Sequence, residues 1–271
     1  MTDAWIIDGV RSPRGRGKAG VGSLSEIHPQ RVMAQVLNGL QEKADFDPAD
    51  VEDVIAGCGS GSGDHAHDIA RLSVLDAGWP ITAPGVTLHR FCGSGQQAVT
   101  FAAMGIMSGQ QDLVVGGGVE SMSRYSPTHT DGFTANNPHL FEQYPLIPQG
   151  ISADLIATIE GFSREDVDRY GVMSQDRAAV SIADGRFNRS LVPIYHNDGK
   201  LALDRDEHPR PGTTMETMAG LNASFEKMGK TLFDGQVKTL DDICTDVYPD
   251  VKEVIHVHHA GNSSGVVDGA S

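Results

Sequence analysis

The chain has 271 residues, of which 39% are hydrophobic, enough for one large domain or two smaller ones with a buried core. Its 36 acidic and 21 basic side chains give a formal net charge of -15, which argues against a nucleic-acid partner. No apolar run approaches the length of a membrane span, and the first residues lack the basic start and apolar core of a signal peptide. We therefore expect no membrane partner and a cytoplasmic location.

Alternating strands and helices are predicted along the first 122 residues. Short apolar or β-branched runs predict strands at residues 5–7, 51–55, 86–88 and 113–115. Apolar residues at helical spacing predict helices over about 29–45, 69–77 and 94–108. Strands that alternate with helices of this length imply βαβ units. We therefore expect an α/β fold with a mostly parallel sheet that helices cover on both faces.

The character of the sequence changes after Met122, where prolines become frequent and periodicity is weak. Within this part, Ser163–Asp166 resembles a capping box and predicts a helix that ends near Gly185. Residues 254–257 then predict a returning strand. The chain is therefore divided into a sheet domain in two pieces, 1–122 and 251–271, and an inserted loop domain, 123–250.

Cys92 lies at the junction between the strand at 86–88 and the helix that follows it. A helix N-terminus favours an anion such as a thiolate, because its backbone N–H groups are unpaired and the helix dipole is positive there. Gly93 and Gly95 keep side chains away from the sulfur, so a substrate carbonyl can approach and its oxyanion can meet backbone donors. Two interpretations remain open from position alone, a reactive nucleophile and an inert buried thiol.

Three motifs carry a resemblance to a known family. Residues 90–99 read RFCGSGQQAV, residues 116–123 read GGGVESMS and residues 261–265 read GNSSG. In this order and over nearly the whole chain they resemble the thiolases, the acetyl-CoA acetyltransferases and 3-ketoacyl-CoA thiolases. The resemblance implies the thiolase N-terminal half, interrupted by a loop domain that covers the active site and holds coenzyme A.

The resemblance also implies chemistry and site residues. Cys92 would be the nucleophile of an acyltransferase that cleaves a 3-ketoacyl-CoA to acetyl-CoA and a shortened acyl-CoA, or runs the reverse Claisen condensation. The positions that match the family's coenzyme A contacts are Arg210, Thr217, Phe225, Ala260 and Ser264. Coenzyme A and acyl-CoA are thus the expected substrates, with no permanently bound cofactor. The expected assembly is a homodimer or homotetramer.

Other cysteines and histidines receive structural interpretations. With Cys58 and Cys244 the chain has three cysteines, an odd number, and none of them has C-x-x-C spacing, so reduced thiols are expected. Acidic neighbours of Cys244 oppose a thiolate there. His256, His258 and His259 lie close together but lack a pattern that supplies a further ligand, so no metal site is expected.

The second half of a thiolase, which carries the family's Asn-Glu-Ala-Phe stretch, its Gly-His-Pro histidine and a second reactive cysteine, has no match in these residues. We therefore expect that the isolated chain can at most accept an acyl group or bind coenzyme A, and that its catalytic turnover is negligible. Two alternatives stay open. One is a noncatalytic acyl-CoA-binding or assembly subunit, which would show affinity without turnover. The other is a ketosynthase-like condensing enzyme, against which residues 117–123 and the large insertion argue.

Overall fold

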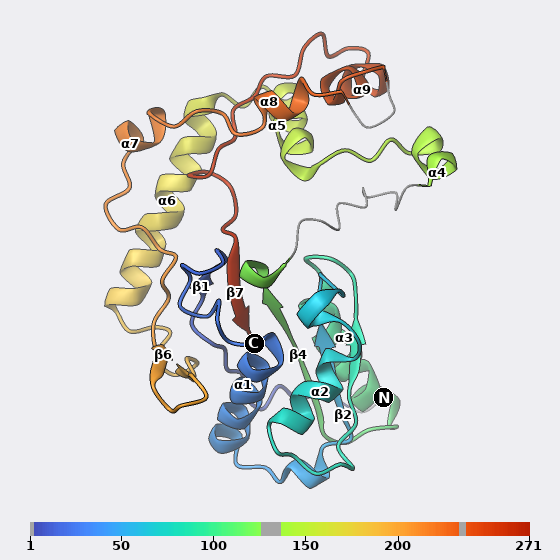
Figure 1. Cartoon of the computed structure of the whole chain (residues 1–271), viewed down its shortest axis with the longest axis vertical. Coiled ribbons are helices and arrows are strands. Elements are labelled where there is room, and N and C mark those ends of the chain that lie inside the picture. Colours follow the sequence, from blue (N-terminus) through green and yellow to red (C-terminus); the bar gives the residue numbers. More distant parts are fainter. Residues whose placement is uncertain (1–2, 126–136, 233–236) are drawn as a thin grey trace. The chain divides into compact units, whose positions relative to one another are not determined.

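A computed structural model describes residues 3–125, 137–232 and 237–271 (Figure 1). The contacts within it define two compact units, which are described separately: unit 1, residues 1–126, 185–208 and 265–271, and unit 2, residues 127–184 and 209–264. These bounds differ from the expected division. Residues 185–208 belong to unit 1, because Ile194 and Leu203 are buried in its core, and residues 251–264 belong to unit 2. The assignment of a coenzyme-binding role to the insertion stays a prediction.

Unit 1 is built on a mixed sheet. Its described strands are β1 Gly15–Arg16, β2 Asp53–Gly57, β3 Val86–Leu88, β4 Val114–Ser121 and β7 Val267–Ala270, in the order β1-β7-β4-β2-β3. β2 pairs in parallel with β3 and β4, whereas β7 pairs antiparallel with β4 and β1. The α/β class is therefore confirmed, with parallel pairing in one part of the sheet. A second sheet of β5 Ile194–Tyr195 and β6 Leu201–Leu203 belongs to the same unit.

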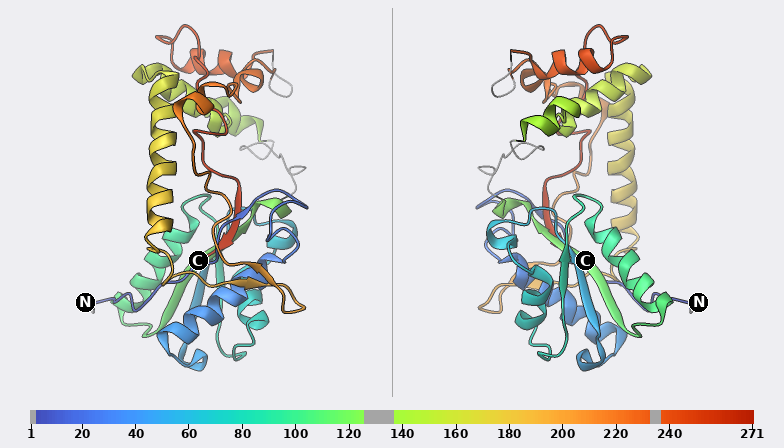
Figure 2. Two further views of the ribbon diagram at one scale, coloured as in Figure 1. Left: turned by 90° about the vertical axis from the view of Figure 1, so that its left-hand side faces the viewer. Right: turned by 90° about the vertical axis from the view of Figure 1, so that its right-hand side faces the viewer.

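The helices of unit 1 cover both faces of this sheet (Figure 2). They are α1 Pro29–Ala44, α2 Ile69–Asp76 and α3 Ser94–Ser108, with the short 3-10 helices η1 Pro48–Asp50, η2 Gly63–His65 and η3 Met122–Arg124. Successive side chains of β2 point to opposite faces of the sheet. Val54 and Ala56 lie on one face and join the core formed with α1 and α2. Ile55, which points the other way, packs with Ala98 and Ala102 of α3.

The predicted helices of unit 1 are confirmed, and their ends have a local cause. α1 ends at Asp45 and α3 at Gly109, both in the left-handed conformation, with φ of 54° and 75°. A strand at residues 5–7 was a wrong prediction. Trp5 and Ile6 are 84% and 85% exposed, and no ladder partner holds them within the described part of the chain.

Unit 2 is helical in its described parts. Its helices are α4 Pro138–Gln143, α5 Gln149–Glu160, α6 Arg164–Ala183, α7 Met215–Ala219, α8 Glu226–Gly229 and α9 Leu240–Val247. The predicted capping box is confirmed, since the Ser163 and Asp166 side chains each accept from the other's backbone N–H at the start of α6. The core of the unit joins Ile151 and Leu155 of α5 to Ile243 of α9.

The strand predicted at residues 254–257 is also absent from the described structure. The backbone N–H groups of Val257 and His258 donate instead to the Asp154 carboxylate, each at 3.0 Å. A side chain thus satisfies donors that a ladder would have used, and the chain re-enters the sheet only at β7.

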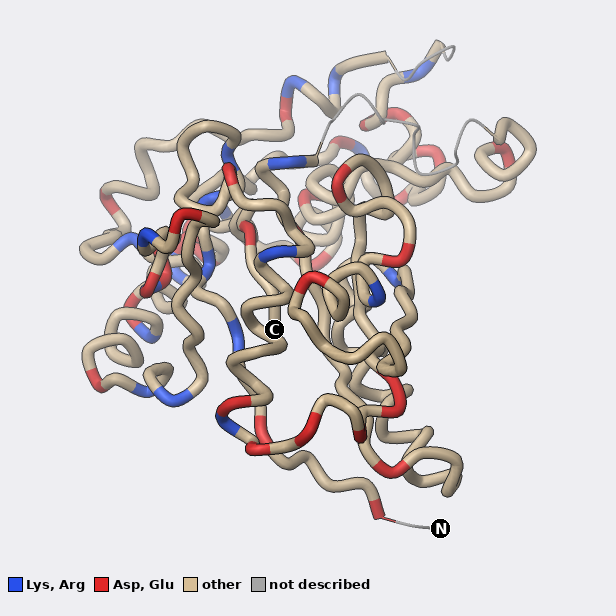
Figure 3. The backbone as a smooth tube through the Cα atoms, turned by 60° about the horizontal axis from the view of Figure 1, so that its bottom comes forward, with Lys and Arg blue, Asp and Glu red and all other residues tan. Residues whose placement is uncertain are grey.

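None of the helices in the described ranges is long and apolar enough to cross a membrane. Acidic positions are distributed along the traced backbone and are not gathered in one segment (Figure 3). An anionic ligand must therefore be attracted by local groups against the overall charge of -15.

Candidate active site

Cys92 is exposed and directly precedes Gly93, the N-cap residue of α3. The residue before it, Phe91, has a φ of 48°, a left-handed conformation that a bulky side chain seldom adopts. Ser94 holds this turn, because its hydroxyl donates to the Phe91 carbonyl at 2.6 Å and accepts from the Arg90 N–H at 2.8 Å. The strained turn therefore holds the thiol at the positive end of a helix of 15 residues.

Glycines in the sheet allow α3 to approach it closely. A Cβ at Gly57, the last residue of β2, would lie 2.4 Å from the backbone carbon of Ser94. A Cβ at Gly116 of β4 would lie 2.9 Å from Cα of Val99. Small residues are thus required at both positions, and they bring the start of α3 to the carboxyl ends of β2 and β3. This edge of a parallel sheet is where ligands commonly bind.

A polar cluster at the end of β4 supports the loop beside the cysteine turn. The Glu120 carboxylate accepts from the Gly59 N–H at 2.7 Å and from the Ser60 hydroxyl. His65 is buried beside it and accepts the Ser121 N–H at Nε2, 2.9 Å away. Burial lowers the pKa of His65, and the nearby Glu120 carboxylate opposes this shift without cancelling it.

The other two thiols differ from Cys92 in exposure. Cys58 and Cys244 are each 2% exposed. Burial raises the pKa of Cys58. Burial, reinforced by the Asp241 carboxylate, raises the pKa of Cys244 to about 11. Buried thiols with raised pKa values are poor nucleophiles, which leaves Cys92 as the best candidate.

All five candidate coenzyme A residues belong to unit 2, whereas Cys92 belongs to unit 1. Arg210, Ala260 and Ser264 are exposed. The Thr217 hydroxyl is engaged in the capping box of α7, where it bonds both to the N–H and to the carbonyl of Thr214. Its role toward a ligand must therefore involve its other atoms or its backbone.

Three of these candidates lie on segments that touch one another. The Ser224 N–H, next to Phe225, donates to the His258 carbonyl at 2.9 Å. Met218, next to Thr217, packs against Gly261, since a Cβ there would lie 2.6 Å from its sulfur. The chain around Thr217, Phe225 and Ala260 therefore forms one connected surface region of unit 2.

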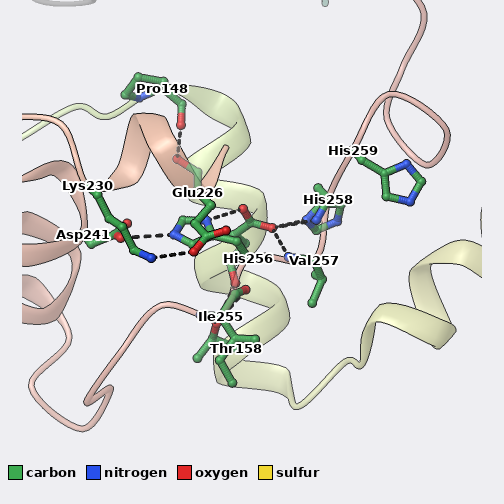
Figure 4. A network of polar contacts seen from close by, with 12 residues as sticks. Pro148, Thr158, Glu226, Lys230, Asp241, Ile255, His256, Val257, His258 and His259 are labelled. Carbon is green, nitrogen blue, oxygen red and sulfur yellow. Dashed lines mark hydrogen bonds and ion pairs between the residues drawn. The ribbon is translucent and has the colours of Figure 1, made fainter. Parts of the chain in front are cut away.

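A second polar cluster, drawn in Figure 4, fastens the segment before Ala260 to the helices. The Asp154 carboxylate, fully buried on α5, bonds to Nδ1 of His256 at 2.8 Å and Nδ1 of His258 at 2.7 Å. Nε2 of His256 bonds to Asp241 of α9 at 3.1 Å. Burial opposes a charge on His256, but the two carboxylates outweigh it and raise its pKa.

A family model described as the thiolase N-terminal domain matches residues 4–242. The chain belongs to the thiolase family. It is 40% identical over 237 residues to the steroid 3-ketoacyl-CoA thiolase FadA6 of Mycobacterium tuberculosis, covering 83% of this chain and 57% of that protein. It is 36% identical over 245 residues to a 3-ketoacyl-CoA thiolase of Psychrobacter cryohalolentis, covering 89% and 62%.

The fold agrees with a solved thiolase structure. The Bacillus anthracis acetyl-CoA acetyltransferase superimposes with a TM-score of 0.75 at 29% identity, over 100% of this chain and 64% of that one. This thiolase chain therefore spans about three fifths of the length of the relatives it matches.

Sequence reasoning missed the two buried aspartates of this thiolase chain, Asp154 and Asp168, which are 0% and 2% exposed. A local pattern is present in the sequence for Asp154. Asp154 lies three residues after buried Ile151 and next to Leu155, on the apolar face of its helix. A carboxylate on such a face must be paired, so its position predicts a partner even though the partner's identity is not visible.

Proposed function

We propose that this chain carries the acyl-accepting part of a thiolase-type acyltransferase, with Cys92 as the nucleophile. The observation that supports this most directly is the exposed thiol at the N-terminus of α3, held by the Phe91 turn. The Cys92 N–H serves as one donor of an oxyanion hole.

The chemistry proceeds in two steps. The Cys92 thiolate attacks the 3-keto carbon of a 3-ketoacyl-CoA, and the bond between C2 and C3 breaks. C2 takes a proton and leaves as acetyl-CoA, while the shortened acyl group stays on sulfur as a thioester. The thiolate of a second coenzyme A then attacks this thioester, releases the shortened acyl-CoA and regenerates the Cys92 thiolate. The proton that C2 takes comes from a general acid, which is not assigned among the residues that the structure describes.

Coenzyme A is proposed to bind through unit 2. The Arg210 guanidinium faces a phosphate or the adenine, and Ser264 meets the pantetheine arm. Exposure of Arg210, Ala260 and Ser264 supports this, because each is accessible to a ligand. A homodimer or homotetramer is the proposed assembly.

Isotope exchange tests this proposal without a proton transfer at C2. The chain is incubated with acetyl-CoA and labelled coenzyme A, and the label entering acetyl-CoA is followed. Reversible acetylation of Cys92 predicts exchange by the wild type and by Cys58→Ser, and none by Cys92→Ser. Saturable coenzyme A binding without exchange would instead favour the noncatalytic acyl-CoA-binding subunit.

A further inference from the structure

The turn His259–Asn262 carries Ala260 at its exposed tip. The Asn262 N–H donates to the His259 carbonyl at 3.1 Å, which closes the turn. In the opposite direction, the His259 N–H donates to Oδ1 of Asn262 at 2.8 Å. The turn is thus closed by backbone and side chain together.

The His259 ring makes two further bonds with different functions. Nδ1 accepts the Gly261 N–H at 3.0 Å, a bond from a side chain to the backbone two residues later. Nε2 bonds to the buried Asp168 carboxylate of α6 at 2.7 Å. Because Nδ1 must accept, the hydrogen of the neutral ring is on Nε2, where it is donated to Asp168.

Asp168 connects this ring to the helix. Its Oδ1 also accepts from the Asn262 amide at 2.8 Å, and its Oδ2 bonds to Arg164 at 2.8 Å. Glycine at position 171, one turn further along α6, leaves room for the turn, since a Cβ there would lie 3.1 Å from the Gly261 carbonyl oxygen. The helix thus holds the turn through a charged anchor and a close backbone contact.

We propose that His259 is a positioning residue for coenzyme A: its Nδ1 sets the shape of the turn that presents Ala260, and Asp168 anchors the ring. This inference rests on the proposed coenzyme A site. His259 itself touches no reacting atom, and it acts through the backbone of Ala260 and Gly261.

Two substitutions distinguish the effect of the bond from Nδ1 to Gly261 from the effect of the bond from Nε2 to Asp168. In His259→Asn, Oδ1 can occupy the place of Nδ1 and accept the Gly261 N–H, as asparagine does in turns, but it cannot reach Asp168. In His259→Leu, both bonds are lost. Both variants therefore lose the anchor and unfold at a lower urea concentration than the wild type, whereas only the leucine variant also loses the turn bond. Glu165→Gln, an exposed change on the same helix, serves as the control.

The measurement is coenzyme A affinity of the 271-residue chain by titration calorimetry, with urea unfolding of each variant. We expect His259→Leu to bind about tenfold more weakly than the wild type and His259→Asn within about threefold of it. Hydrogen exchange at the Gly261 amide is expected to be slow in the wild type and in His259→Asn, and fast in His259→Leu.

Equal affinity of all three proteins would overturn the inference while leaving the coenzyme site intact. An equal loss of coenzyme A affinity in both variants would overturn it as well. Loss of the bond to Asp168 alone would then explain the result, and the bond from Nδ1 to Gly261 would have no role. A wild type that does not bind coenzyme A, although its Gly261 amide is protected, would overturn the proposed coenzyme site and the inference that rests on it.

Discussion

At the scale of single residues, the three thiols differ in exposure. Cys92 is exposed, whereas Cys58 and Cys244 are buried. Iodoacetamide at neutral pH is expected to add one label to the native chain, and peptide mapping is expected to find it on Cys92, because buried thiols with raised pKa values do not react. In urea all three should react. Labelling of Cys58 or Cys244 before Cys92 in the native chain would contradict this description.

Gly150 offers a second test at this scale, because a Cβ there would lie 2.3 Å from Cε1 of Phe225. Gly150→Ala must displace the ring and is expected to lower the free energy of unfolding by about 1–3 kcal/mol and to weaken coenzyme A binding. Gly220→Ala is a matched control, since its added Cβ would meet nothing nearer than 3.8 Å. Urea unfolding measures the stability of both variants. Equal stability of the two would contradict the close packing of Phe225 against Gly150.

Some residue roles follow from sequence and others do not. The place of Cys92 at the start of a helix follows from local pattern, because the strand, the glycines and the helical spacing are all nearby in the chain. The pairing of His259 with Asp168 spans 91 residues and depends on how α6 packs, so no local pattern contains it. The capping bonds of the Thr217 hydroxyl differ from this pairing, because they join residues only three apart and so form a local pattern that sequence reasoning missed.

At the scale of elements, His256 joins α5 to α9 by bonding to a carboxylate of each helix. Its pKa is raised above the ordinary value of 6.5 by Asp154 and Asp241 in spite of burial. Its stabilising contribution is therefore fully present below pH 6.5 and is lost as pH rises through the higher pKa of the folded state.

His256→Gln is accordingly expected to lower stability by roughly 1–3 kcal/mol at pH 6, and by less at pH 9. Urea unfolding at the two pH values measures this. His139→Gln, which changes an exposed histidine of α4, is the control and should be neutral at both. A difference between wild type and His256→Gln that grows with pH would contradict the proposed charge state.

Element boundaries with local causes were predictable. The capping box at Ser163, the Pro29 start of α1 and the Gly109 end of α3 depend on a few adjacent residues. The strand expected at 254–257 does not form because the N–H groups of Ile255 and Val257 bind side chains of α5, Thr158 and Asp154, about a hundred residues earlier. An extended apolar run predicts extended backbone, but it cannot reveal what the backbone bonds to.

At the scale of the whole molecule, the two units contain histidines with opposite pH dependence. Burial lowers the pKa of His65 in unit 1, so the stability linked to it is present above pH 6.5 and is lost as pH falls through the folded pKa. Both tryptophans belong to unit 1, and only Trp79 is buried, so tryptophan fluorescence reports on that core.

Unfolding followed by Trp79 fluorescence is expected to shift to lower urea between pH 7 and pH 5, and to shift less in His65→Gln. Exposure of the Cys244 thiol reports on unit 2 and is expected to show no such dependence on His65. A wild type and a His65→Gln variant that lose stability equally on acidification would contradict the lowered pKa of the buried His65.

The intact mass of the chain reports whether Cys92 is the nucleophile of a thiolase-type acyl transfer. The wild type, Cys58→Ser and Cys92→Ser are each weighed before and after incubation with acetyl-CoA, whose thioester can acetylate a thiolate without any proton transfer at carbon. We expect an acetyl-sized gain on the wild type and on Cys58→Ser, and none on Cys92→Ser. The same gain on Cys92→Ser, or no gain on any of the three, would contradict this role of Cys92.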